Sequence, residues 1–195
     1  MPDQPMLTLS GSRSFAVESA RARDILARLR ADGFEAVRVK IESAPWAAEV
    51  PRRPCDGGRY FEHRVKLRLT AGTDLAAPTA RVVPHGAHLS WNARRVRADG
   101  RPEPFVTQRC RGADAEGAGR ALEALLAELA GLAGFEVVSV EREFVLYDSD
   151  VSVDDGWIEE TVGVLGGQGV RGWRRAAGGT SRPKAGWGRE CDDRA

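Results

Sequence analysis

The histidines are the side chains of this chain best suited to acid–base chemistry near neutral pH. There are three, His63, His85 and His88, and imidazole has an ordinary pKa close to that range. A histidine that moves a proton, an arginine that meets phosphate oxygens and a carboxylate that orients the base would together act on a phosphoester or a nucleotide. On this interpretation the candidate catalytic residues are His63, Arg109 and Glu143.

A second group of charged side chains could bind an anionic ligand without any reaction. Residues 60–69 alternate between apolar and charged side chains, which is the pattern of a strand with one buried face and one charged face. Cations on that face would meet phosphate oxygens, and a carboxylate could hold a metal or orient a base. The candidate ligand-binding residues are Arg64, Lys66, Arg68, Glu141, His88 and Asp148.

A structural interpretation competes with both. Positive and negative side chains are interleaved on the charged positions of these strands, and facing residues of adjacent antiparallel strands lie about 4.5–5.5 Å apart, so they can neutralise one another. His63 itself falls on the apolar side of residues 60–69, where a hydrogen-bonded core histidine is the simpler expectation. His85 and His88 flank Gly86 at a turn and fit surface positions equally well.

No pattern in the sequence indicates a cofactor or a structural metal. Cys55, Cys110 and Cys191 are odd in number, far apart and free of any Cys-x-x-Cys pair, which favours a reducing compartment over a disulfide framework. The glycine-rich residues 163–169 lack the Gly-Lys-Ser/Thr ending that cradles phosphates. We therefore expect a cytoplasmic protein without cofactor or metal.

The elements that must position these residues are marked by a repeated phrase. Residues 33–42 and 134–143 are identical at six of ten positions, and both begin Gly-Phe-Glu. Each copy follows an amphipathic run with leucine or isoleucine at helical spacing. The repeated unit is thus expected to be a helix, a tight turn at glycine and a strand.

The order of predicted elements gives an α+β fold. The expected strands are residues 6–10, 34–43, 60–69, 87–96, 104–111 and 135–147, and the expected helices are residues 15–31, 73–84 and 113–132. Residues 59–160 then form a ferredoxin-like βαββαβ block, with helices on one sheet face and a charged open face on the other. Residues 1–45 add an N-terminal βαβ half-repeat, and the Pro/Gly-rich residues 46–58 form a linker.

The charge and composition of the chain indicate which classes of binding partner to expect. Residues 161–195 hold seven basic residues against three acids and are poor in aliphatic side chains, so we expect a disordered basic tail. The other 160 residues carry 22 basic and 25 acidic side chains, which does not match the concentrated basic face of a nucleic-acid domain. The longest apolar stretch is interrupted by Glu123 and Glu128, so no membrane span is expected.

Three segments carry a resemblance to other proteins. Residues 60–63 read Tyr-Phe-Glu-His, residues 105–109 read Phe-Val-Thr-Gln-Arg, and residues 134–149 begin Gly-Phe-Glu and end Asp-Ser. Together they resemble a group of small uncharacterised bacterial proteins with a βαββαβ layout, over residues 59 to about 158. The resemblance implies the ferredoxin-like fold without an established activity. If the group has a site, the resemblance places it here at His63, Thr107, Arg109, Glu143 and Asp148.

Three functions remain open from the sequence. The first is a cofactor-free binding or regulatory module that assembles through its open sheet face as a homodimer. The second is a phosphoester- or nucleotide-acting enzyme that uses His63 or His88 with the neighbouring cations and Glu143. The third is RNA binding through arginine-rich strands and the tail, where aromatic side chains would stack on bases, although the charge balance makes nucleic acid the less expected partner.

Overall fold

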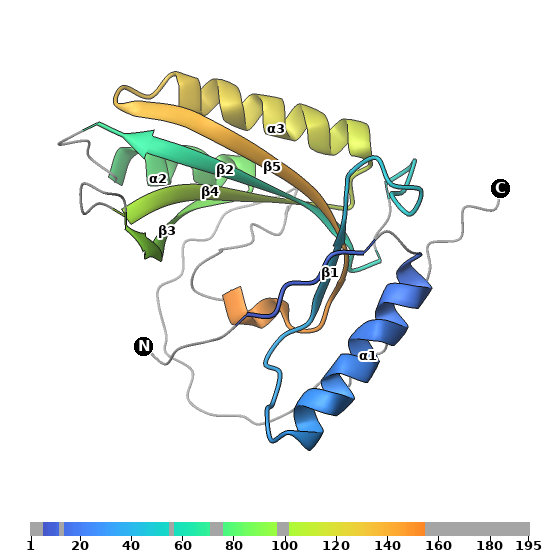
Figure 1. Ribbon diagram of the computed structural model, residues 1–195. Helices are drawn as coiled ribbons and strands as arrows, with labels where there is room; N and C mark the ends of the chain where they lie inside the picture. The colour runs from blue at the N-terminus through green and yellow to red at the C-terminus, as the bar shows by residue number, and fades with distance from the viewer. Residues whose placement is uncertain (1–5, 12–13, 55–56, 71–75, 97–101, 155–195) are drawn as a thin grey trace, which may run out of the picture.

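The computed structural model describes residues 6–11, 14–54, 57–70, 76–96 and 102–154. These residues form a mixed α+β structure with one antiparallel sheet of five strands, in the order β1-β5-β2-β4-β3, and three α-helices (Figure 1). The elements in chain order are α1 (Phe15–Ala31), β1 (Lys40–Ser43), β2 (Tyr60–Leu69), α2 (Ala76–Val82), the 3₁₀ helix η1 (Val83–His85), β3 (Ala87–Val96), β4 (Pro102–Arg111), α3 (Ala115–Ala130), β5 (Phe135–Asp148) and the 3₁₀ helix η2 (Val151–Asp154).

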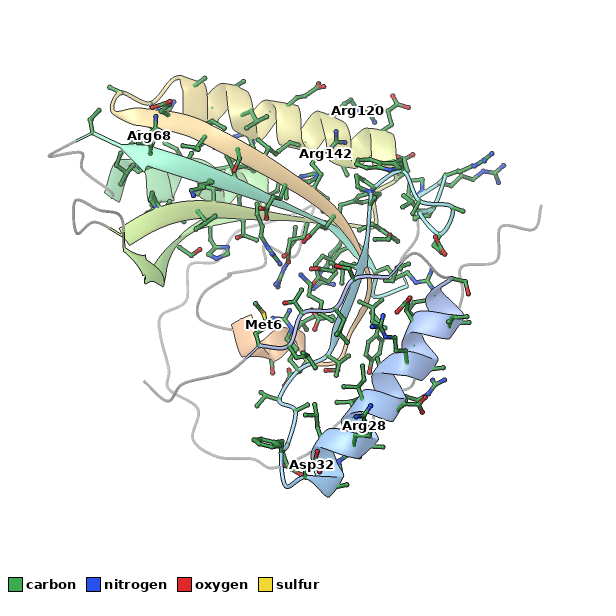
Figure 2. All side chains as sticks on the ribbon, viewed as in Figure 1. Met6, Arg28, Asp32, Arg68, Arg120 and Arg142 are labelled. Carbon is green, nitrogen blue, oxygen red and sulfur yellow. The ribbon has the colours of Figure 1, made fainter. Side chains whose placement is uncertain are left out.

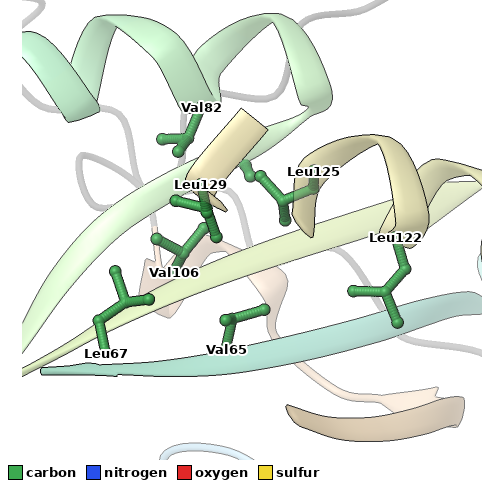
Figure 3. Packing of buried hydrophobic residues seen from close by; sticks show 8 residues of the cluster. Val65, Leu67, Val82, Val106, Leu122, Leu125 and Leu129 are labelled. Carbon is green, nitrogen blue, oxygen red and sulfur yellow. The ribbon is translucent and has the colours of Figure 1, made fainter. Parts of the chain in front are cut away.

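The main core fills the space between the sheet and the helices α2 and α3 (Figure 3). Its buried members are Val65, Leu67, Val82, Ala87, Val106, Leu122, Leu125 and Leu129. The strand residues alternate along the chain and the helix residues recur every three or four positions, so each set forms one face of its element. Asp114 caps the first turn of α3 by accepting a hydrogen bond from the Gly117 N–H at 2.8 Å.

A second core ties the N-terminal segment to the other end of the sheet. Phe61 of β2 and Phe144 of β5 lie 4.7 Å apart between ring centroids, and Phe15 at the start of α1 packs against this cluster. Beyond Phe15, α1 is weakly held, because Ser19 is the one residue of this helix that is buried. Figure 1 shows α1 apart from α2 and α3, beside the end of the sheet where β1 meets β5.

The two copies of the repeated phrase differ in structure. Gly33 and Gly134 both adopt a positive φ, of 84° and 85°, as the expected turns require. The second copy enters β5 at once, whereas the first becomes a strand only at Lys40, and Phe34 stays 62 % exposed. Residues 6–10 also form no strand. The N-terminal segment therefore contributes one helix and one short strand among the described residues, rather than the expected βαβ half-repeat.

The bounds of the other expected helices and strands are close to those in the structure. The bounds of α1, β2 and β3 coincide with the predicted ones. The helix α3 is two residues shorter at each end, β4 begins two residues earlier, and β5 ends one residue later than predicted. The predicted helix over residues 73–84 is represented by α2 and η1, and residues 71–75 lie outside the described residues. The predicted disordered tail, residues 161–195, lies outside them as well.

Candidate functional site

The sheet has two unlike faces. Successive strand residues point to opposite faces, and residues that are paired across antiparallel strands point to the same one. Val65 and its partners Val106 and Val140 face α3 and the main core. The residues between them face the other side, which neither α2 nor α3 covers (Figure 1). We call this side the open face.

Three rows of paired residues cross the open face. The Glu62 row contains Arg109, Glu62 and Glu143; the Arg64 row contains His88, Thr107, Arg64 and Glu141; the Lys66 row contains Ser90, Phe105, Lys66 and Ser139. Arg68 follows at the far end of β2, where it pairs with Glu136 (Figure 2). Of the candidate residues predicted from the sequence, His63 is the one that points away from this face, and Asp148 is paired with Lys40 at its β1 edge.

His63 lies on the opposite face, beneath α3, and is 1 % exposed. Its Nδ1 is 2.9 Å from Gln108 Oε1, while Gln108 Nε2 donates to the backbone carbonyls of His85 and Ala121. Gln108 Oε1 is therefore the acceptor, and the proton of the neutral imidazole lies on His63 Nδ1. Arg142 is the partner of His63 on β5 and extends toward α3 (Figure 2).

The predicted catalytic set is thus divided between two faces. Arg109 and Glu143 share the Glu62 row, but His63 follows Glu62 directly in β2 and so points the other way. Burial lowers the pKa of His63, and nearby Arg142 lowers it further, although the hydrogen bond to Gln108 acts in the opposite direction. The structure assigns His63 to the core and does not bring it together with Arg109 and Glu143.

A buried carboxylate, Glu62, organises the cations of the open face. Glu62 is 2 % exposed. Its Oε1 accepts hydrogen bonds from Lys40 Nζ at 2.8 Å and from Arg64 Nη2 at 2.9 Å, and its Oε2 accepts one from Arg109 Nε at 3.1 Å. Burial alone would raise the pKa of Glu62, but the three cations, led by Lys40, lower it to about 2.

Two more carboxylates complete this ion cluster, which we define as Lys40, Glu42, Glu62, Arg64, Arg109 and Glu143. Oxygens of its three carboxylates lie within 4.8 Å of one another. Lys40 pairs with Glu42 at 2.5 Å, and Arg64 lies 3.6 Å from Glu143. Burial raises the pKa of Glu143, and Glu42 raises it further, against the opposing effect of Arg64. Three carboxylates so placed could bind a metal, but each already faces a cation, so we interpret the cluster as an ion-pair network.

The ion cluster continues into a network around Tyr60. The Tyr60 hydroxyl donates to Asp148 Oδ2 at 2.7 Å, and Asp148 also accepts from Arg38 Nε at 2.8 Å. Arg111 and Arg109 lie 4.6 and 5.1 Å from the centroid of the Tyr60 ring, within cation–π range. Asp148, a predicted ligand residue, therefore joins the segment before β1 to β5 and β2.

The Arg64 and Lys66 rows have a different character. Arg64, Lys66, His88 and Thr107 are half-buried side chains that can each donate a hydrogen bond to an anion, and we call these four residues the donor patch. Their pairing places Thr107 between His88 and Arg64, with Lys66 one row further. Within these two rows the single carboxylate is Glu141, on the β5 side. The sequence anticipated Arg64, Lys66 and His88 as ligand residues.

Some residues that matter here were not among the sequence candidates. Lys40 and Glu62 are central to the ion cluster, and the sequence signal for Glu62 was its place among the alternating charged side chains of residues 60–69. Cys110, at the end of β4, has a protonated thiol at neutral pH, because burial raises its pKa to about 11. An open hollow of about 400 Å³ beside Trp46 and Asp114 contains none of the candidate residues.

Comparisons with known proteins identified no relative of this chain. A scan against protein-family models found no match, and searches of curated proteins and of solved structures found none either. No helix among the described residues has both the length and the apolar character needed to cross a membrane. The geometry of the open face is therefore the basis for inferring a function.

Proposed function

We propose that this protein is a cytoplasmic binding module that holds a phosphate-bearing ligand on the open face of a ferredoxin-like sheet. One observation carries the proposal: the donor patch gathers two cations, an imidazole and a hydroxyl in adjacent rows, with Glu141 as the single carboxylate of those rows. Cations and hydroxyls that converge in this way are the donors that phosphate oxygens accept from.

The strand order supports the ferredoxin-like part of the proposal. Residues 60–148 form strands in the order β5-β2-β4-β3, all antiparallel, with α2 and α3 packed against the core side. This is the arrangement in which a βαββαβ chain leaves one sheet face uncovered. The short strand β1 adds to the β5 edge and contributes Lys40 and Glu42 to the ion cluster without covering the donor patch.

Binding fits this geometry better than phosphoester catalysis. A phosphoester enzyme of the kind considered from the sequence uses a general acid and a general base near the same phosphorus. His63 is buried on the other face, and His88 is then the histidine that a strand places on the open face. His63 is thus excluded as the partner of His88 in proton transfer, whereas anion binding needs no second histidine.

The test is calorimetric titration of the full chain with inorganic pyrophosphate at low ionic strength. The variant Lys66→Gln should bind roughly tenfold more weakly or worse, because it removes a charge-assisted hydrogen bond. Arg120→Gln is the matched control, since it removes one positive charge from the exposed surface of α3. The control should bind like the wild type.

Two results would overturn the proposal. One is a wild-type protein that takes up no pyrophosphate at millimolar concentration, and the other is equal affinity in Lys66→Gln. Light scattering under the same conditions checks the homodimer expected from the sequence. A dimer that dissociates as pyrophosphate is added would mean that a second copy and the ligand compete for the open face.

A further inference from the structure

Phe105 is an aromatic side chain on the polar face of the sheet. Its neighbours in β4, Pro104 and Val106, are buried on the helix side, so Phe105 points to the open face. Among the described residues, the two core clusters and the apolar side chains packed against them do not include Phe105. The ring is half-buried, and neither core cluster of the described residues accounts for that burial.

The neighbours of Phe105 belong to the proposed anion site. Lys66 is its partner on β2 and Ser90 its partner on β3. Thr107 lies two residues along β4 on the same face, about 6.5–7 Å away at the usual rise of a strand. A planar group stacked on Phe105 would therefore lie one row from Thr107 and Arg64, a separation that a ribose can bridge.

We infer that the ligand of the donor patch is a mononucleotide, with its base stacked on Phe105 and its phosphate held by Lys66, Thr107 and Arg64. The inference rests on the proposed anion-binding function and names its substrate class. Aromatic rings on an open antiparallel sheet are a known platform for base stacking, and every base offers a π-face to such a ring.

Charge on the rest of the face favours a mononucleotide over a single strand of nucleic acid. Glu141 closes the Arg64 row on the β5 side, and Glu143 and Glu62 lie in the next row. A longer polyanion that leaves the donor patch in that direction would pass over these carboxylates. Strand binding also needs several aligned cations, whereas the next cation in that direction, Arg109, is bound to Glu62.

The experiment compares three probes by calorimetry: AMP, ribose 5-phosphate and inorganic pyrophosphate. Stacking of one base should make AMP bind roughly fivefold to a hundredfold more tightly than ribose 5-phosphate. In Phe105→Leu this ratio should fall to about one. Phe34→Leu is the matched control, because Phe34 is an exposed aromatic residue before β1, and it should keep the wild-type ratio. Thermal melting of each variant checks that it is folded.

The outcomes separate this inference from the function beneath it. Equal binding of AMP and ribose 5-phosphate, together with pyrophosphate binding that depends on Lys66, would overturn the nucleotide and leave the anion site standing. A wild-type ratio that persists in Phe105→Leu would overturn the role of Phe105. Tighter binding of a single-stranded oligonucleotide, with affinity that falls steeply with salt, would replace the mononucleotide by nucleic acid. Failure of all three phosphate probes would overturn both proposals.

Discussion

The open face has two ends that are built from similar residues and behave differently. At one end the ion cluster surrounds Glu62, a carboxylate buried beneath three cations. Lys66 lies four residues further along β2, about 13 Å from Glu62 at the usual strand rise. None of the residues paired in the Lys66 row is a carboxylate. The two ends therefore differ in the number of carboxylates that lie beside their cations.

Arg64 lies at the boundary between these ends. Its Nε and Nη2 both bind Glu62 Oε1, at 3.0 and 2.9 Å, so the guanidinium is held in place by the ion cluster. A donor that is already ordered loses less conformational entropy when an anion binds. The ion cluster therefore acts as a rigid support for the donor patch.

The largest expected effect comes from removing the charge at the centre of the ion cluster. Glu62→Gln removes the negative charge that Lys40 and Arg109 share, and both cations stay in a buried environment. This should lower the free energy of unfolding by about 3–5 kcal/mol. Urea denaturation measures this loss. Glu141→Gln is the matched control on the exposed part of β5 and should change stability by less than about 0.5 kcal/mol. Similar values for the two variants would show that the two ends do not differ energetically.

Low pH should weaken the ion cluster of the wild-type protein by protonating Glu62. The pKa of Glu62 falls from its ordinary value of 4.5 to about 2 on folding, so the unfolded chain binds the proton more readily. The stabilisation is complete above about pH 4.5 and is lost as the pH falls toward 2, with a size of about 3 kcal/mol. The difference between wild type and Glu62→Gln, measured by urea denaturation from pH 5 to 2, should shrink accordingly. A constant difference over that range would contradict the prediction.

A weaker pH effect should arise on the helix side, at His63. Its pKa is lowered in the folded protein by burial, which is the largest effect, and by Arg142, against the opposing effects of the Gln108 hydrogen bond and of Glu62. The unfolded chain therefore takes up the proton first, and stability should fall as the pH drops below the ordinary histidine value of 6.5. Denaturation at pH 8 and at pH 5.5 should show this slope in the wild type and a shallower one in His63→Gln. Equal slopes would mean that His63 is not the group that titrates.

The smallest effect is expected beyond the donor patch, at the exposed pair of Arg68 and Glu136. Their side chains are 48 % and 61 % exposed and lie 2.7 Å apart. Such surface pairs contribute about 0–1 kcal/mol. A double-mutant cycle with Arg68→Ala and Glu136→Ala should give a coupling energy in that range. A coupling as large as that of the ion cluster would show that burial is not what separates the two ends.

The sequence predicted the elements that depend on local pattern. Residues 60–69 alternate so regularly that the bounds of β2 coincide with the prediction, and the helical spacing of Leu125 and Leu129 marked α3. The strand predicted over residues 34–43, the first copy of the repeated phrase, begins only at Lys40. Phe34 lacks a neighbouring strand in the described residues and Phe135 has Leu69 opposite it, which shows that pairing, and not local sequence, makes the strand.

The candidate site was predictable in its composition but not in its grouping. Alternation alone places Arg64 and Lys66 on the charged side of β2. Which residue of β4 lies opposite Glu62 depends on the register of the pair, which no local pattern records. The separation of His63 from Arg109 and Glu143, and the arrival of Lys40 from the N-terminal segment, are consequences of that long-range register.

The short length of β1 has a consequence for the whole face. Lys40 and Glu42 belong to a strand of four residues at the edge of the sheet, yet both contact groups from the centre. Fraying of that strand withdraws one positive and one negative charge together, so the net charge of the face stays constant while Glu62 loses one of its three cations. Opening of this edge would therefore remove part of the ion cluster that holds Arg64, and amide hydrogen exchange along β1 measures how often the edge opens.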